Sequence, residues 1–300
     1  MSTPPEEQAK EHGVCAVDAW FVPAPGQPAV KQETLVVEEA LISIDVEGVG
    51  WYTLMWTPTA SAHEVLGFTA SGGVMAPTDD PEVLALTAGF LFTEGLIEGM
   101  RDVASMEVCN NDPSIIVVRL KRPDLVKPRR KDVVMGSSCG VCGGREAVEN
   151  VAAGLKPVSH NLSLNSEQFS QVLSAMRELQ TVFGMTGGAH AAAVFDRHAR
   201  IVALAEDLGR HNALDKVIGK CLLNSIDLSA CGVLLSSRLS LEMITKAARA
   251  GFEVVAAVSA PTSLAIEIGK RFGITLCGFV RGGRATIFSH PERITEMPVG

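Results

Sequence analysis

Apolar and polar positions follow a clear period in the second half of the chain. Residues 165–180 carry apolar side chains at helical spacing, and Asn165 and Gln168 have the spacing of a capping box. Beyond residue 190, short apolar runs alternate with amphipathic segments, which predicts strands alternating with helices. The predicted strands span 191–195, 201–205, 232–236, 252–258, 274–280 and 285–289, and the predicted helices span 212–223, 239–250 and 262–272.

The first half is predicted to contain more β-structure. Residues 34–46 and 51–56 are rich in strand formers and flank a Gly-Val-Gly turn, so a hairpin is expected. A helix is expected to begin at Asp80-Pro81, with Asp as N-cap and Pro at the first helical position, and to end at Gly95. Residues 114–120 predict a further strand.

This order of elements indicates an α/β fold, in which βαβ crossovers cover both faces of a sheet. A basic segment with two prolines, residues 119–131, is typical of an exposed connection, and we place a domain boundary within it. The predicted division is a flexible N-terminus (1–30), a small N-terminal α+β domain (31–128) and a larger α/β domain (129–300). Residues 61–77 lack periodicity and are interpreted as a loop or an inserted segment, whose role stays open.

Composition narrows the class of protein. The chain is 47% hydrophobic and 20% charged, as in an ordinary globular enzyme, which excludes general disorder. Its net charge of −8 argues against nucleic acid as a partner. Residues 1–12 lack the apolar core of a signal peptide, and no run approaches the roughly 18 apolar residues of a membrane span. We therefore expect a cytoplasmic protein without a membrane partner.

Seven cysteines in a chain of this kind are expected to be reduced thiols rather than a disulfide framework. Most of the five single cysteines lie in apolar surroundings or at element ends, which predicts inert packing residues. These five are Cys15, Cys109, Cys221, Cys231 and Cys277.

The other two, Cys139 and Cys142, form a Cys-x-x-Cys pair within the glycine-rich segment Gly136–Gly144. A structural zinc site needs further ligands, and the sequence has no second pair at suitable spacing, so no metal is expected. Dithiol redox chemistry fits the basic, glycine-flanked surroundings less well. A third possibility is sulfur relay, in which a thiolate carries sulfur as a persulfide. The helix-like run Arg145–Ala153 would favour that thiolate.

Other polar motifs fall at junctions between predicted strands and helices, where α/β sheets bind ligands. Residues 185–190 contain paired glycines that allow the backbone to approach a phosphate, and a plain turn explains them equally well. Residues 236–238 and 281–284 place arginines beside small residues, which suits phosphate groups and flat rings.

The segment 206–216 is denser in charge than the others. Asn212 with Asp215 is predicted to cap a helix, so that Arg210 and His211 would face an anion at its N-terminus. An internal ion network is the alternative, and we favour the ligand site.

Together these segments resemble the FdhD/NarQ family of formate dehydrogenase accessory sulfurtransferases, from about Glu33 to Ile294. The resemblance rests on segments 89–97 (GFLFTEGLI), 139–143 (CGVCG), 186–193 (TGGAHAAA), 206–216 (EDLGRHNALDK), 235–238 (LSSR) and 278–286 (GFVRGGRAT). Between Thr57-Pro58 and Leu84-Ala85 the chain carries more residues than the family pattern.

The resemblance implies a sulfur carrier that takes sulfur as a persulfide from a cysteine desulfurase. It would deliver this sulfur to the bis-molybdopterin guanine dinucleotide molybdenum cofactor before insertion into formate dehydrogenase. Guanine nucleotides would mimic part of that cofactor. The larger domain is expected to be a cytidine-deaminase-like three-layer α/β domain, and the protein is expected to be a homodimer.

The resemblance also assigns site residues. Cys139 is expected to carry the persulfide, with Cys142 assisting. The expected cofactor-binding residues are Phe279, Val280, Arg281, Gly282, Gly283 and Arg284 near the C-terminus, and Thr186, Gly187, Gly188, His190, Glu206, Asp207, Gly209, Arg210, His211, Asp215, Lys216 and Arg238 in the earlier motifs.

Deaminase activity does not follow from the expected fold. A zinc deaminase needs His-x-Glu followed by Pro-Cys-x-x-Cys, whereas His190 is followed by two alanines and the cysteine pair precedes it. Two alternatives to the sulfur carrier stay open. One is a chaperone that holds the cofactor without sulfur chemistry, and the other is a dithiol redox protein.

Overall fold

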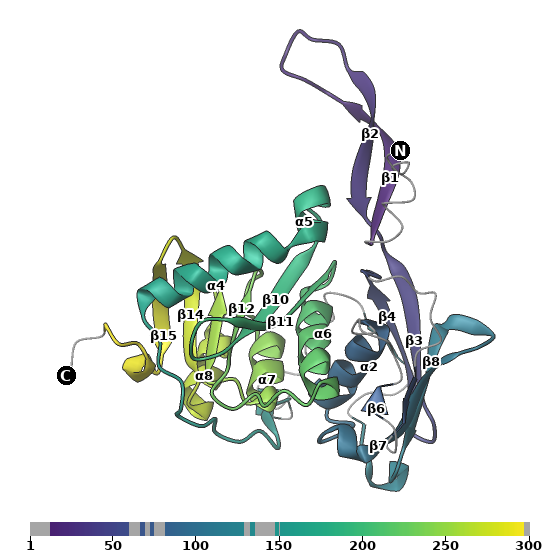
Figure 1. Ribbon diagram of the computed structural model, residues 1–300, viewed down its shortest axis with the longest axis vertical. Coiled ribbons are helices and arrows are strands. Elements are labelled where there is room, and N and C mark those ends of the chain that lie inside the picture. The colour runs from purple at the N-terminus through teal and green to yellow at the C-terminus, as the bar shows by residue number, and fades with distance from the viewer. Residues whose placement is uncertain are drawn as a thin grey trace.

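The protein consists of two sheets with their helices and a protruding two-stranded arm (Figure 1). This computed structural model describes residues 13–59, 67–69, 73–74, 82–128, 133–135, 148–149 and 151–296. None of the described helices is long and apolar enough to cross a membrane.

The second half of the chain builds a six-stranded sheet. The third, fourth and fifth strands in sheet order are parallel to one another, and every other neighbouring pair is antiparallel; the first and last of these pairs are hairpins. The strands, in sheet order, are β11 (Ile201–Asp207), β10 (His190–Phe195), β12 (Gly232–Leu235), β13 (Val254–Ala257), β14 (Thr275–Arg281) and β15 (Arg284–Ser289).

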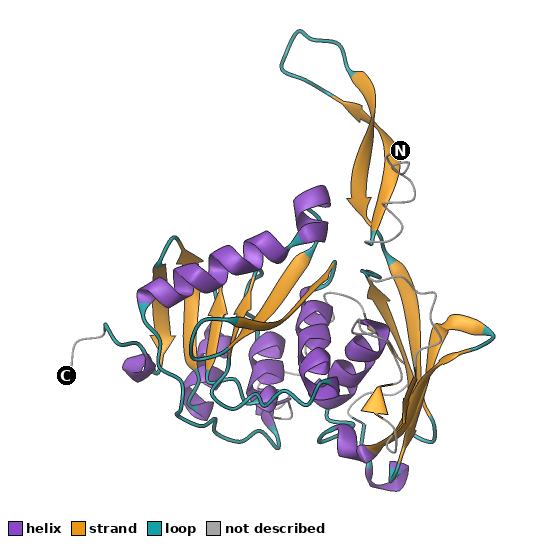
Figure 2. Cartoon of the chain, viewed as in Figure 1, coloured by secondary structure: helices purple, strands orange, loops and turns teal. Residues whose placement is uncertain are grey.

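Helices cover both faces of this sheet (Figure 2). On β13, Val255 and Ala257 pack toward α6 (Arg210–Leu223), α7 (Leu241–Ala250) and α8 (Ser263–Phe272). The intervening Val254 and Ala256 pack toward α4 (Ser166–Leu179) on the other face. Both sets are buried because side chains alternate along a strand and both faces are covered. The predicted fold class, a three-layer α/β domain, is confirmed.

The described residues of the first half form a seven-stranded sheet and one long helix. The sheet order is β6 (Gly73–Val74), β5 (Gly67–Thr69), β7 (Val103–Cys109), β8 (Asp112–Leu120), β3 (Ala40–Val46), β4 (Gly50–Trp56) and β9 (Val133–Met135). Helix α2 (Glu82–Thr93) packs Leu84, Leu91 and Phe90 against residues of β3 and β4. This confirms the α+β character and the predicted β3–β4 hairpin. The domain boundaries near 30 and 128 stay predictions.

Most helix ends agree with the sequence. Asn165 and Gln168 form the predicted capping box at α4, and Gly251 and Gly273 end α7 and α8 in the left-handed conformation. Short 3₁₀ turns occur at Met100–Asp102, Pro123–Leu125 and Pro291–Arg293.

Helices α2 and α6 join the two halves through backbone contact. A Cβ atom on Gly219 would lie 1.7 Å from the carbonyl oxygen of Ala85, and one on Gly89 would lie 1.8 Å from that of Asp215. Side chains at these positions would force the helices apart. The glycines therefore set the distance between the halves.

The arm consists of β1 (Val14–Phe21) paired with β2 (Val30–Val37). Its base packs on the short helix α5 (Thr181–Thr186), where Val14, Leu35 and Val37 meet Val182 and Ala189. The interpretation of residues 1–30 as a loose N-terminus did not anticipate β1. Beyond its base, the arm is not covered by a described helix or by a second layer of described strands. Its strands therefore lack the buried apolar runs by which other strands can be recognised in the sequence.

Candidate functional site

The predicted motifs meet along one edge of the six-stranded sheet. Strands β11, β12, β13 and β14 run in the same direction and end at this edge, and β10, which runs the other way, begins there. His190 at the start of β10 is directly paired with Asp207 at the end of β11. The edge beyond the carboxyl ends of parallel strands is where ligands bind in sheets of this class.

Two features of its surroundings affect the pKa of His190, namely burial of its ring and the nearby positive charge of Arg210. Its Nδ1 is 3.4 Å from Oγ of Ser236, which also accepts the backbone N–H of Ala191 at 2.9 Å. Burial lowers the pKa of His190 and the charge of Arg210 lowers it further. His190 is therefore neutral near neutral pH, and its ring acts as a hydrogen-bonding group rather than as a cation.

Arg210 and His211 open helix α6 at this edge. The buried Nε of Arg210 meets no hydrogen-bond acceptor among the described residues. Nε2 of His211 lies 3.0 Å from Oε2 of Glu242 at the start of α7. Sequence reasoning did not single out Glu242, because a glutamate in a first helical turn is an ordinary feature. A buried guanidinium nitrogen without a protein acceptor is a position where a ligand oxygen fits.

The predicted cap of this helix was wrong. Helix α6 begins at Arg210, with Gly209 as N-cap, so Asn212 lies inside the helix. Asn212 instead donates to the carbonyl oxygen of Met55 at 2.6 Å and to Oδ1 of Asp207 at 3.1 Å. The helix starts earlier because Asp207 accepts the backbone N–H of Gly209 at 2.8 Å and turns the chain.

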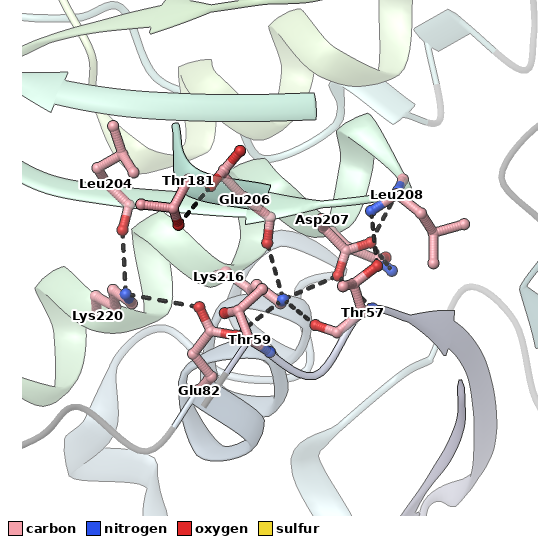
Figure 3. A network of polar contacts seen from close by, with 12 residues as sticks. Thr57, Thr59, Glu82, Thr181, Leu204, Glu206, Asp207, Leu208, Lys216 and Lys220 are labelled. Atoms are coloured by element: carbon pink, nitrogen blue, oxygen red, sulfur yellow. Dashed lines mark hydrogen bonds and ion pairs between the residues drawn. The ribbon is translucent and has the colours of Figure 1, made fainter. Parts of the chain in front are cut away.

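Asp207 and Lys216 form the centre of a buried polar network (Figure 3). Nζ of Lys216 lies 3.0 Å from Asp207 and 3.1 Å from Glu82, and donates to the carbonyl oxygen of Thr57 at 2.7 Å. Burial opposes the charge on Lys216, but the two carboxylates outweigh it and its pKa is raised. The network connects α2, the end of β4, the end of β11 and α6.

Two further residues of the 206–216 segment also bind within the protein. Glu206 accepts the backbone N–H groups of Val182 and Phe183 at 2.9 Å each, and so holds the N-terminus of α5; its pKa is raised by burial. Asp215 accepts from Lys246 at 2.6 Å and from Thr93 at 2.8 Å. The structure thus places Glu206, Asp207, Asp215 and Lys216 beneath the edge, in positions that hold it together.

The paired glycines of residues 186–188 form a tight connection from α5 to β10. Gly187 ends α5 in the left-handed conformation, and Gly188 donates to Oγ1 of Thr186 at 3.1 Å. A Cβ atom on Gly188 would lie 2.9 Å from a methyl group of Val37 at the base of the arm. Gly188 therefore provides room for the arm, while Gly187 faces solvent.

The segment 279–284 borders a cavity of about 490 Å³ on the α4 side of the sheet. Phe279 has a positive φ of 55° and an exposed ring, as expected of a residue held in a special conformation. Arg281 and Arg284 are exposed, and Val280 is buried in the core. Sequence reasoning missed four cavity residues from distant segments, Ser166, Phe169, Ile294 and Glu296. The exposed Arg238 lies three residues beyond the end of β12.

The predicted catalytic residues Cys139 and Cys142 lie outside the described residues. Of the described cysteines, Cys221, Cys231 and Cys277 are buried, as predicted. Burial raises the pKa of Cys231 to about 11 and that of Cys277 further, so neither is a thiolate at neutral pH. Among the described residues no group of His, Cys, Asp and Glu is arranged to hold a metal ion.

Comparison with known proteins agrees with the motifs. The model of the FdhD/NarQ family matches residues 75–295. The chain belongs to the FdhD/NarQ family. A protein named "Sulfur carrier protein FdhD" from Thermoplasma acidophilum is 38% identical over 234 residues, covering 76% of this chain and 81% of that protein. One of the same name from Bordetella bronchiseptica is 35% identical over 269 residues, 89% of each chain.

The fold of this FdhD/NarQ member has a counterpart in a crystal structure. A protein from Desulfotalea psychrophila assigned as a formate dehydrogenase accessory protein superposes with a TM-score of 0.69, covering 94% of this chain and 99% of that one. The two sequences are 22% identical, so this likeness concerns the fold. The β1–β2 arm precedes the residues that the family model matches.

Proposed function

We propose that this FdhD/NarQ protein is a sulfur carrier that serves the maturation of formate dehydrogenase. The names of its relatives support this function. The observation that carries the proposal is the gathering of segments 186–190, 206–211, 235–238 and 278–284 on one sheet edge. At one end of this edge lies the buried Nε of Arg210, which has no acceptor among the described residues, and at the other lies the 490 Å³ cavity beside Phe279.

The sulfur chemistry is assigned to Cys139. Its thiolate attacks the terminal sulfur of a persulfide on a cysteine desulfurase, and a new S–S bond forms as the desulfurase S–S bond breaks. The desulfurase cysteine leaves as a thiolate, so the exchange needs no added oxidant or reductant. To release the sulfur, the Cys142 thiolate attacks the inner sulfur of the Cys139 persulfide, so that a Cys139–Cys142 disulfide forms as the S–S bond of the persulfide breaks and the outer sulfur leaves at the sulfide level. An external thiol reductant then returns the disulfide to two thiols. The described buried cysteines are unsuited to this role because burial disfavours their thiolates.

The acceptor of the sulfur is proposed to be the bis-molybdopterin guanine dinucleotide molybdenum cofactor, bound as a substrate. Strands β10 and β14 are three positions apart in the sheet. At about 4.8 Å per strand, His190 and the end of β14 are separated by roughly 14 Å. This separation suits an elongated, phosphate-bearing molecule, with Arg210, Arg238, Arg281 and Arg284 as its cations. The exposed ring of Phe279 offers a surface for stacking.

The test of the sulfur chemistry is intact-protein mass spectrometry after incubation with a cysteine desulfurase and cysteine. The wild type is expected to gain the mass of one sulfur atom, and Cys139→Ala is expected to lose most of that gain. Cys109→Ala is the matched control, because Cys109 is a partly exposed cysteine away from the motif. A Cys139→Ala variant that gains sulfur as well as wild type would exclude the assignment.

A cofactor-binding chaperone is the second candidate. The buried Nε of Arg210, which has no acceptor among the described residues, favours it, because binding of a ligand without sulfur chemistry would already satisfy that nitrogen. It predicts that a variant lacking both Cys139 and Cys142 still restores formate dehydrogenase activity in cells. A dithiol redox protein would instead reduce a model disulfide and show no heat of binding in a guanosine diphosphate titration. The sulfur carrier is expected to bind guanosine diphosphate, to act in the cytoplasm and to form a homodimer.

A further inference from the structure

The β1–β2 arm projects from the body of the molecule, and its outer end is apolar (Figure 1). Residues 19–30 form this tip: the ends of the two strands and the loop that connects them. Large apolar side chains that lie together at an exposed position indicate a contact surface. Four such side chains are exposed at the tip: Trp20 by 68%, Phe21 by 51%, Val22 by 74% and Val30 by 54%.

The tip is apolar on both of its faces. Phe21 is paired with Val30, and alternation along the strands places Trp20 on the opposite face. The tip carries no charged side chain, and Gln27 is its one polar side chain, in a chain with a net charge of −8. A flat protein surface would cover one face and leave the other in water. A medium that surrounds the tip would cover both.

The boundary between the tip and the rest of the arm carries the nearest charges. Lys31 is paired directly with Trp20, so the two side chains lie on the same face. Lys31 also forms an ion pair of 2.5 Å with Asp18, further from the tip. A tryptophan and a lysine at the same level are typical of a membrane–water interface, where the ring lies among the headgroups and the ammonium reaches water.

The backbone of the connecting loop, residues 22–29, is suited to an apolar medium. The N–H of Gln27 is used within the loop, since it donates to the carbonyl oxygen of Ala24 at 3.3 Å. A backbone donor without a partner is costly in lipid, where no water can replace the partner. The loop loses less on leaving water because three of its residues have no backbone N–H, namely Pro23, Pro25 and Pro28.

The area of the tip also distinguishes the kinds of partner. Its four exposed side chains present roughly 400 Å² of apolar surface, given that a large aromatic side chain contributes about 150–250 Å² when fully exposed. A standard protein–protein interface covers about 800 Å² on each partner, which the tip does not reach. Lipid binding has no such threshold, because its strength scales with the apolar area that leaves water.

We propose that the tip of the arm inserts into the surface of a lipid bilayer, with Trp20 and Lys31 at the level of the headgroups. Such insertion is shallow, about 5–10 Å, and leaves the rest of the chain in water. The expectation of no membrane partner rested on the lack of a spanning segment, which a peripheral contact does not need. The proposal is independent of sulfur transfer, because it rests on the arm alone.

The test is flotation of the full chain with vesicles of phosphatidylcholine, a lipid without net charge. The wild type is expected to float with the vesicles. Phe21→Asp or Val22→Asp is expected to lower the partition constant by about tenfold or more, because a carboxylate replaces an apolar side chain within the bilayer surface. Leu125→Asp is the matched control and should float like wild type, since Leu125 is 66% exposed and lies outside the arm. Equal melting temperatures of all variants establish that they are folded.

The charge of the lipid separates apolar insertion from binding by a basic surface. Replacing part of the phosphatidylcholine by phosphatidylglycerol is not expected to strengthen binding, because anionic headgroups repel a chain with a net charge of −8. Binding that requires phosphatidylglycerol would contradict insertion of the uncharged tip.

Tryptophan fluorescence locates the part of the chain that enters the lipid. Phosphatidylcholine brominated on its acyl chains quenches a tryptophan that lies within the bilayer. It is expected to quench the wild type and not Trp20→Phe, which keeps an apolar ring and still floats, because Trp51 and Trp56 lie on β4.

The proposal is overturned if the wild type does not float, if both aspartate variants float as well as wild type, or if Trp20 is not quenched. A tip that fills an apolar groove of another protein would leave the vesicles unbound, and this outcome would overturn it as well.

Discussion

The backbone N–H of Thr57 donates a hydrogen bond of 3.0 Å to Oδ2 of Asp207, 150 residues further along the chain. The contact is reciprocal, because Oγ1 of Thr57 accepts the N–H of Leu208 at 3.1 Å. Thr57 follows the last residue of β4, and Asp207 is the last residue of β11. The first half of the chain thus fixes the position of the segment that opens α6. The candidate site is built by both halves, although its motifs come from the second.

Replacing Lys216 by Met is expected to destabilise the protein by about 3–5 kcal/mol, because Glu82 and Asp207 would be left buried without their shared cation. The measurement is the free energy of unfolding from urea denaturation. Lys220→Met is the control: Lys220 is partly exposed and lies 3.7 Å from Glu82, so its loss should cost clearly less. Equal costs for the two variants would contradict the central role of Lys216.

Gly219→Ala is expected to cost about 3 kcal/mol or more, since its methyl group would meet the backbone of Ala85, which cannot rotate away. Gly184→Ala is the matched control. Gly184 is an exposed helical glycine with nothing near its Cβ position, so alanine there should raise stability by up to about 1 kcal/mol. Thermal unfolding of both variants checks the pair. A Gly219→Ala variant as stable as wild type would show that α2 and α6 are not fixed by this contact.

Local periodicity explains which elements could be predicted. The apolar face and capping box of α4 are encoded within its own residues, and β10, β12, β13 and β14 are largely buried apolar runs bounded by turns. The α/β topology also predicts that the motifs share one edge. Short elements were missed: α5 has six residues and β9 three, too few for a period to be seen.

The internal contacts of the site could not be predicted in the same way. Lys216 binds Thr57 and Glu82, which are 159 and 134 residues away in sequence, and no local pattern specifies those partners. A dense charged segment is compatible with a ligand site and with an ion network alike. Here the segment divides: Asp207 and Lys216 face inward, while Arg210 opens the helix at the edge.

Glu82 is expected to make stability depend on pH in the acid range. Burial alone would raise its pKa, but Lys216 and Lys220 outweigh burial, so the pKa lies below the ordinary value of 4.5. A lowered carboxyl pKa stabilises the fold above the ordinary value, and this contribution is lost as pH falls through the folded value. The free energy of unfolding of wild type minus that of Glu82→Gln should be constant above about pH 5 and should shrink below about pH 4. A difference independent of pH would refute the assigned shift.

His190 is expected to titrate below its ordinary value of 6.5, because burial and then the positive charge of Arg210 disfavour its protonation. The measurement is an NMR titration, with the His190 signals assigned from a His190→Gln variant. Arg210→Met should raise the midpoint by removing the charge. Arg238→Met, at an exposed arginine on the same edge, should leave it unchanged. Because a lowered histidine pKa means that the unfolded chain binds the proton more readily than the folded chain, His190 lowers the free energy of unfolding as pH falls below about 6.5.

An anion bound at Arg210 would offset the positive charge, so added guanosine diphosphate should raise the His190 midpoint in wild type and not in Arg210→Met. A midpoint at or above 6.5 in the free wild type, or one that Arg210→Met leaves in place, would remove Arg210 from the surroundings of His190.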